Sequence, residues 1–410
     1  MSNPGSQTVT SITSTITAPF IITTNTCGTT LAGGATCDVT VTYTPTAQSQ
    51  SDSGTLTFAS VSGTGAAQSL SMTLSGSAFH YFVYAANSTD STVSPFSINT
   101  NSGALTSVGS AIACSAGPFQ IAADPLGKFI FVSGGTGNSV SAYQVNSSTG
   151  VLTAVSGSPF TVGSTPVGVV ADPTGSYLYV ADFASDDITA FTINRTTGSL
   201  TAMTGSPFAA PGGNSPLDLQ MDSQGRFLYV SSRAGEEFVY TINASTGSLT
   251  LLSGAPFASG LSWGWGSALD PSGNFILIAS STIAEISSMA VDVAGALSAE
   301  TGSPFTSSTT GGFGIAMNST GTFAFLANGA ANTISSFSIA AGIPTKIQEL
   351  AAGSSQFYLT VDPSDQYVLV PNRTTNNVSS YKIGNTGLLS HLSDATAGTA
   401  PITVKVLSVP

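Results

Sequence analysis

A nine-residue turn-and-strand motif, present in six copies, constrains this chain more than any other feature of its sequence. One copy begins at Asp172 and reads DPTGSYLYV. Asp-Pro followed by Gly is typical of tight turns, and the alternating aromatic and aliphatic run indicates a strand. Together with it, the six copies begin at Asp124, Asp172, Asp222, Asp270, Asn318 and Asp362. The spacings between successive copies are 48, 50, 48, 48 and 44 residues. A period in the forties built of short strands predicts a β-propeller.

Two further parts of the repeat occur seven times, which sets the number of blades. The glycine of a second turn falls at Gly103, Gly150, Gly198, Gly247, Gly295, Gly342 and Gly387. The first strand of each blade, the inner strand, also occurs seven times. Six copies begin at Pro118, Pro166, Pro216, Gly264, Gly312 and Gln356, and residues 401–407 are the seventh. We therefore predict seven four-stranded blades. Pairing of residues 401–407 with residues 82–87 would close the ring and leave no open sheet edge.

Composition supports an all-β protein and excludes some partners. The chain has 410 residues, of which 41% are hydrophobic and only 7% charged, and its net charge is −12 with eight Lys and Arg. So few basic residues argue against a nucleic-acid partner. No apolar run reaches the ~18 residues of a membrane helix, so we expect no membrane insertion. The first residues show no signal peptide.

Residues 1–78 lack the repeat and predict a separate domain. Alternation in DVTVTY and SLSMTLSG indicates antiparallel sandwich strands. The segment TCG-x-x-LAGGATCDVTVTYTP and the closing LSGSA resemble the Hydin-like, "choice-of-anchor D" immunoglobulin-type domain of bacterial surface proteins. That family has a further strand before the Asn3-Pro4-Gly5 position, so we expect this domain to be incomplete at its N-terminus.

The resemblance also implies a Cys27–Cys37 disulfide and hence an oxidising, extracellular or cell-surface location. Taken from the residues alone, two buried thiols remain the alternative. The third cysteine, Cys114, is expected to be a small buried side chain.

Residues 79–410 carry the second resemblance. The run ADPTGSYLYVADFASDDITAFTINRTTGSLT and its copies resemble the seven-bladed lactonase-type propellers, a family that includes 6-phosphogluconolactonase-like and muconate-cyclising enzymes. The resemblance implies the seven-bladed fold. It does not fix the activity, because many propellers share a scaffold and not a reaction.

Charged and aromatic residues gather in the loops that follow the second and fourth strands of the blades. These two sets of loops share one face, and three consecutive repeats supply most of their charge. The predicted ligand-binding residues there are Asp182, Asp186, Asp187, Arg233, Glu237, Trp263 and Trp265. Trp offers a flat apolar surface to a sugar, and Arg offers a planar fork to a carboxylate. A solvated loop face is the alternative explanation. We expect no cofactor or metal, since the one loop with three aspartates is a weak signal for Ca²⁺.

Two functions fit these features. The preferred one is a secreted or surface-attached binding protein for a small polar molecule, a glycan or another surface protein. The alternative is a hydrolase acting on a sugar-acid lactone, for which Arg233 and Arg373 match the arginine of the family's V-A-N-R segment. Glu236, Glu237 and Asp187 would then be candidates for the catalytic carboxylate. The family's histidine has no counterpart on this face, because His80 and His391 fall elsewhere.

Overall fold

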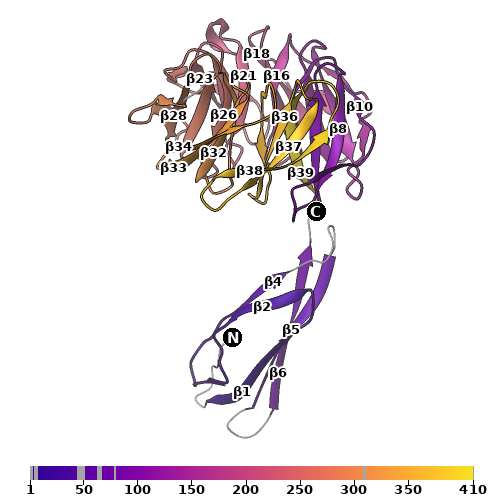
Figure 1. Ribbon diagram of the computed structural model, residues 1–410, viewed down its shortest axis with the longest axis vertical. Coiled ribbons are helices and arrows are strands. Elements are labelled where there is room, and N and C mark those ends of the chain that lie inside the picture. Colours follow the sequence, from indigo (N-terminus) through magenta and orange to yellow (C-terminus); the bar gives the residue numbers. More distant parts are fainter. Residues whose placement is uncertain are drawn as a thin grey trace. The chain divides into compact units, whose positions relative to one another are not determined.

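The computed structural model describes residues 3, 8–43, 51–61, 67–77, 80–307 and 311–409. They form two compact units, Met1–His80 and Tyr81–Val409. The second unit contains seven antiparallel sheets of four or five strands (Figure 1). It is a seven-bladed β-propeller, as the repeat predicts. The predicted boundary between residues 78 and 79 lies outside the described residues, as does most of the Asn3-Pro4-Gly5 segment.

Each blade is a meander that starts at the central axis. The inner strands are β11 (Pro118–Ala123), β16 (Pro166–Ala171), β21 (Pro216–Met221), β26 (Gly264–Leu269), β31 (Gly312–Met317), β35 (Thr360–Val361) and β39 (Pro401–Val409). The second strands are β7 (His80–Asn87), β12 (Phe129–Gly134), β17 (Tyr177–Asp182), β22 (Phe227–Ser232), β27 (Phe275–Ser280), β32 (Phe323–Asn328) and β36 (Tyr367–Asn372). The third strands are β8 (Thr92–Ile98), β13 (Ser139–Val145), β18 (Asp187–Ile193), β23 (Glu236–Ile242), β28 (Glu285–Val291), β33 (Thr333–Ala340) and β37 (Asn377–Ile383).

The outer strands pair with the third strands. They are β9 (Leu105–Ser107), β14 (Leu152–Ala154), β19 (Leu200–Ala202), β24 (Leu249–Leu251), β29 (Leu297–Ala299), β34 (Ile343–Ala351) and β38 (Leu389–Thr396). Five blades add a two-residue strand beyond them, namely β10 (Ile112–Ala113), β15 (Phe160–Thr161), β20 (Phe208–Ala209), β25 (Phe257–Ala258) and β30 (Phe305–Thr306). One short 3-10 turn, η1 (Pro211–Gly213), precedes β21.

The repeated aspartate holds the turn between the first two strands of a blade. In the third blade, Asp172 Oδ1 accepts hydrogen bonds from the backbone N–H groups of Ser176 and Tyr177, both at 2.6 Å. Its other oxygen accepts from the Thr174 N–H at 3.0 Å. A carboxylate that satisfies backbone donors fixes the turn and starts the second strand in register, which explains why the motif recurs.

The glycine of the second turn is required by a contact with the neighbouring blade. Gly198 has φ +75°, and a Cβ there would lie 2.5 Å from the Phe129 ring. Gly150 stands in the same way against Phe82 of the blade before it. Six of the seven turns pack in this way against the aromatic residue near the start of the second strand of the preceding blade, and the exception is Gly342, which lies beside Glu300.

The C-terminal strand completes the first blade, whose strand order is β10-β8-β7-β39. In Figure 1 the yellow β39 lies beside the purple strands of this blade. The Ser88 N–H also bonds the Ala400 carbonyl at 3.0 Å. Strands from the two ends of the propeller thus share one sheet.

One inner strand is shorter than its repeat predicts. The sixth copy should begin at Gln356, but β35 covers only Thr360–Val361. The Gln356 side chain donates to the Gly353 carbonyl and to Asn372 Oδ1. These local bonds hold the segment before β35 outside the ladder.

The first unit has two sheets, ordered β3-β1-β5-β6 and β2-β4. Side chains from both sheets and the two cysteines share one small hydrophobic core. The strands are β1 (Val9–Ile16), β2 (Phe20–Asn25), β3 (Thr30–Leu31), β4 (Val39–Tyr43), β5 (Ser51–Val61) and β6 (Ala67–Ser77).

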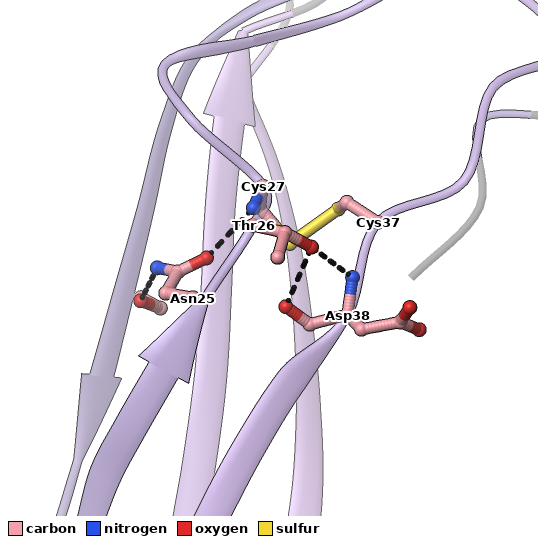
Figure 2. The surroundings of a disulfide bond; sticks show 6 residues. Asn25, Thr26, Cys27, Cys37 and Asp38 are labelled. Carbon is pink, nitrogen blue, oxygen red and sulfur yellow. Dashed lines mark hydrogen bonds between the residues drawn. A yellow bond between two sulfur atoms is a disulfide. The ribbon is translucent and has the colours of Figure 1, made fainter.

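The Cys27–Cys37 disulfide is present, with its Cα atoms 4.8 Å apart. Figure 2 shows hydrogen bonds on both sides of it: the Cys27 N–H donates to Asn25 Oδ1, and Thr26 Oγ1 bonds both the N–H and the carbonyl of Asp38. The predicted pairing is therefore confirmed. The immunoglobulin-type assignment of this unit stays a prediction, and so does its location outside the cell.

Candidate functional site

Asp182 is used inside its own blade. It is fully buried at the end of β17, and its Oδ2 accepts from Thr189 Oγ1 at 2.6 Å. The same position in three other blades carries a buried asparagine that donates to the serine seven residues on, in the pairs Asn87–Ser94, Asn328–Ser335 and Asn372–Ser379. The bond from strand end to third strand is thus a repeated structural feature.

Asp187 faces Asp182 in the β17–β18 register, which places two carboxyl groups side by side. Burial, and then the nearby Asp187 charge, raise the pKa of Asp182 to about 7. Burial also raises the pKa of Asp187, whose Oδ1 accepts from Ser185 Oγ at 3.1 Å. Two such neighbours favour a single shared charge.

Asp186 and Glu236, on neighbouring blades, bond to one loop between them. Asp186 has φ +58°, and its Oδ1 accepts from the Ser215 N–H at 2.8 Å. Asn214 Nδ2 donates to Glu236 Oε2 at 2.6 Å. The loop at residues 211–215 is therefore tied to an acid on each side, and the structure brings these two predicted positions together.

Glu237 lies in the core instead of in a loop. It is completely buried at the second position of β23, where other blades carry Val or Ile. Ser231 Oγ donates to its Oε2 at 2.8 Å, and within the described chain Oε1 has no hydrogen-bond partner. Burial raises the pKa of this carboxyl well above its usual value, with a smaller contribution from the charge of Asp218. Burial therefore favours the neutral form of this carboxyl group.

The two tryptophans belong to different clusters. Trp263, at φ +61°, lies beneath the guanidinium of the exposed Arg233, whose Cζ is 4.0 Å from the ring centroid. Trp265 instead contacts aromatic side chains from other blades. Its ring is 6.3 Å from Phe119, 5.4 Å from Phe313 and 6.1 Å from Phe357.

These four rings form an aromatic layer across the axis: Phe119, Trp265, Phe313 and Phe357. Phe119 and Trp265 belong to blades that are not neighbours in the ring, so their side chains can meet only near the axis. Arg373 is stacked on one edge of the layer, with Cζ 4.7 Å from the Phe357 centroid. Its Nε is buried and makes no hydrogen bond to a described residue. The sequence placed Arg373 and Trp265 on one face, and Phe357 connects them.

Below the aromatic layer is a polar cluster that the sequence analysis missed. Asp218 accepts from Gln120 Nε2 at 2.7 Å, and from the N–H and Oγ of Ser267 at 2.7 and 2.9 Å. Burial raises its pKa, against the effect of these donors. Burial also lowers the pKa of Lys405, against the attraction of Asp218. Inner strands of four blades supply the cluster: β11, β21, β26 and β39.

A signal for this cluster was present in the repeat. Counting from the first residue of each inner strand, the third and fifth positions face the axis. Three of the seven copies, in β16, β26 and β31, carry Gly at the third position and Ala or Val at the fifth. By contrast, β21 carries Asp218 and Gln220, and β39 carries Thr403 and Lys405. A charged residue at a position that repeats as Gly or Ala is therefore the feature to look for.

The cavity associated with this cluster has a volume of about 390 Å³. The polar cluster lies at one end of its lining, and Pro271, Asn318 and Ser319 of the turns between first and second strands lie at the other. It therefore extends from beneath the aromatic layer toward the turn face, away from the loops that carry the predicted acids.

Among the residues that the structure describes, no three His, Cys, Asp or Glu side chains are arranged to hold a metal ion. Nor does any helix in this part of the chain have the length and apolar character needed to span a membrane. His391 lies on the outer strand β38 and bonds Asp394 at 3.0 Å.

Comparison with known proteins identifies the propeller. The family model described as "Lactonase, 7-bladed beta-propeller" matches residues 115–215 and 298–406, which together are just over half of the chain. The chain belongs to this lactonase family. A comparison with curated protein sequences found no match.

Solved structures agree with the family at the level of fold. A proposed 6-phosphogluconolactonase of Bacteroides uniformis superposes with a TM-score of 0.70 at 17% identity, over 80% of this chain and 99% of its own. The periplasmic gluconolactonase of Pseudomonas aeruginosa gives 0.69 at 16% identity, over 81% and 100%. A proposed 6-phosphogluconolactonase of Bacteroides fragilis gives 0.68 at 18%, over 80% and 98%. These three structures cover 80–81% of this lactonase-family chain, which corresponds to the propeller unit, Tyr81–Val409.

Proposed function

We propose that this lactonase-family propeller hydrolyses a sugar-acid lactone. Family membership and solved relatives that are named as gluconolactonases favour hydrolysis over the binding-protein interpretation. The observation that carries the proposal is the position of Arg373, stacked on the aromatic layer at the axis with an unpaired Nε.

The aromatic layer and Arg373 provide what a lactone needs for binding and polarisation. Rings such as Trp265 and Phe357 offer flat apolar surface to the C–H face of a sugar ring. A guanidinium beside them can donate to the lactone carbonyl oxygen and stabilise the negative charge that develops there. No carboxylate of the described residues forms an ion pair with Arg373 that would compete for this charge.

The reaction itself requires little covalent chemistry from the protein. Water adds to the carbonyl carbon and loses a proton, the ring C–O bond breaks, and the released alkoxide takes up a proton to leave a hydroxy acid. Glu236 has a half-buried carboxylate that already accepts from Asn214. Glu237 is enclosed, and burial raises its pKa, so it suits a proton donor better than a base.

A hydrolysis assay with matched arginine variants tests the proposal. Proton release from glucono-δ-lactone and from 6-phosphogluconolactone is followed in weak buffer, and the spontaneous rate is subtracted. Arg373→Met should lower kcat/KM about 100-fold, since it removes one charged donor to the oxyanion. Arg233→Met, which changes the other stacked arginine, should have a smaller effect.

Two variants then assign the carboxyl group, because Glu236→Gln and Glu237→Gln change one candidate each. A wild-type rate equal to the spontaneous rate on both lactones would refute the proposal. Equal activity of Arg373→Met and wild type would move the site away from the aromatic layer.

The Arg233–Trp263 stack supports binding of a sugar or polar ligand as a second candidate function. Truncation of such a stack should weaken ligand binding by about 1–3 kcal/mol. A glycan-binding screen that finds a ligand sensitive to Arg233→Ala and Trp263→Ala, in a protein without lactonase activity, would favour this candidate. The proposed location outside the cell rests on the Cys27–Cys37 disulfide.

A further inference from the structure

The cavity on the turn side of the aromatic layer has the features of a second ligand site, separate from the loop face. Small side chains at the axis-facing positions of several inner strands leave its space open; they include Ala122, Gly266, Ala268 and Ala316. A volume of about 390 Å³ lies within the range of small-molecule sites. The polar groups that line it determine which ligand it can bind.

The one acidic group that lines the cavity is already bonded to the protein. Asp218 accepts from Gln120 and twice from Ser267, and Gln220 Nε2 approaches its Oδ2 at 3.4 Å. Gln120 reaches it from two blades away, and Gln120 Oε1 accepts from the Val169 N–H of the intervening blade at 3.2 Å. The carboxylate is thus held in place as a fixed charge and not as a free acceptor.

The basic group of the cavity has no such set of partners. Lys405 makes no hydrogen bond or ion pair to any residue in the described part of the chain, within the distances that define them. Its side chain is exposed to solvent and lines the cavity at the axis of the propeller. An ammonium group carries three donors, and one that lines a cavity is stabilised there by an anion or by water.

A second donor lines the same cavity. Tyr358 is 7% exposed, and its hydroxyl makes no well-formed hydrogen bond to a described residue. The side chains of Gln120 and Trp265 lie close enough to lower its pKa, but burial has the larger effect and raises it, so the group stays a donor. The cavity is therefore lined by two side-chain donors, Lys405 and Tyr358, that have no hydrogen-bond partner among the described residues.

We propose that this cavity binds a small oxyanion, with the Lys405 ammonium as the principal contact and the Tyr358 hydroxyl as a second donor. The anion is a carboxylate or a phosphate no larger than a sugar acid. It sits on the Lys405 side, while Asp218, neutralised in part by its donors, sets the position of the ammonium. This site does not depend on the proposed lactonase activity, because its residues lie below the aromatic layer and not at Arg373.

Isothermal titration calorimetry of the full chain tests the site with three separate probes: sodium acetate, sodium gluconate and sodium phosphate. Glucose serves as the uncharged control for gluconate. We expect saturable binding of at least one anion with one site per chain, and no binding of glucose. Comparison of acetate and gluconate with phosphate shows whether the site prefers a carboxylate or a phosphate.

Variants of the two donors locate the binding. Lys405→Met should weaken it at least tenfold, Lys405→Arg should keep most of it, and Tyr358→Phe should weaken it several-fold. Lys128→Met, which removes an exposed lysine from a turn, is the matched control and should bind like wild type.

Two results would overturn the proposal. One is the absence of saturable binding of all three anions by wild type. The other is equal binding by wild type and a Lys405→Met variant whose melting temperature shows that it is folded.

Discussion

On the loop face of the propeller the acidic residues bond mainly to nearby loops and strands, whereas along the axis several polar groups lack partners. Asp186 and Glu236 hold the loop at residues 211–215 from both sides. Arg373 Nε and the Tyr358 hydroxyl, by contrast, are buried at the axis without hydrogen bonds to the described residues. Buried oxygens of Asp182 and Glu237 on the loop side also lack partners, but they are acceptors enclosed within a blade. The unpaired groups at the axis differ because they are donors that lie beside aromatic rings and a cavity.

This difference changes where function should be sought. Charge in a loop costs little, because water solvates it, so its presence says little about a ligand. A buried polar group without a partner costs free energy, and a fold retains it only against that cost. The aromatic layer and the cavity beneath it are therefore better candidates than the acidic loops.

The largest effect is expected from removing the strand that completes the axis. A chain truncated after Thr399 loses β39, and with it the inner strand of the first blade together with Thr403 and Lys405. The exposed edge of β7 should then cause unfolding or aggregation of the propeller. Circular dichroism melting and gel filtration measure this loss.

The control is Lys405→Met in the full chain, which keeps the strand and changes only the axis. It should melt cooperatively near the wild-type temperature. A truncated protein that matched wild type in melting temperature and solubility would show that closure by β39 is not needed.

The sequence predicted the scaffold well because the scaffold repeats. Turn chemistry at Asp172 and the interblade contact at Gly198 occur in most blades, so each copy supports the reading of the others. The count of seven followed from the glycine and from the C-terminal copy of the inner strand.

The site could be predicted less well, because it depends on single departures from the repeat. Asp182 looks like a loop residue, yet it takes the place of a structural asparagine, and Glu237 looks like its neighbour Glu236, yet it points into the core. Burial depends on register to within one residue, and the register of β23 is set by pairing that the loop sequence does not reveal. Gln120 and Asp218 meet across 98 residues of sequence, which no local pattern indicates.

A medium effect should separate the fourth blade from the others. Ser231 faces Glu237 in the register of β22 and β23, where the next two blades have Ala279–Ile286 and Ala327–Ile334. The double variant Ser231→Ala/Glu237→Ile copies them and removes an unpaired buried oxygen. It should stabilise the propeller by about 1–3 kcal/mol at neutral pH, measured as an increase in melting temperature.

The sign of the pH dependence adds a second test of the same pair. The pKa of Glu237 is raised in the folded protein, so folding becomes less favourable as the group ionises. The folded protein is therefore most stable with respect to this group at low pH, and it loses stability as pH rises. The advantage of the double variant should therefore grow with pH. A variant less stable than wild type at every pH would mean that the carboxyl is needed for packing.

The smallest effect concerns the acidic loop of the third blade, where Asp182→Asn would make it resemble the seventh. There Asn372 Nδ2 donates to Asn377 Oδ1 at 2.8 Å, at the positions that correspond to Asp182 and Asp187. An asparagine at 182 could donate to Asp187 in the same way.

Since burial raises the Asp182 pKa to about 7, the contribution of this group to stability is present below its ordinary pKa of 3.8 and is lost as pH rises toward 7. Asp182→Asn should therefore match wild type near pH 4 and be more stable at pH 8, by about 1–2 kcal/mol or a few degrees in melting temperature. The reciprocal Asn372→Asp is the matched control, and it should lose stability over the same range. If instead the wild type proved more stable than Asp182→Asn at pH 8, the ionised carboxylate would be serving a partner outside the blade, and the loop face would again be the better place to look for a ligand.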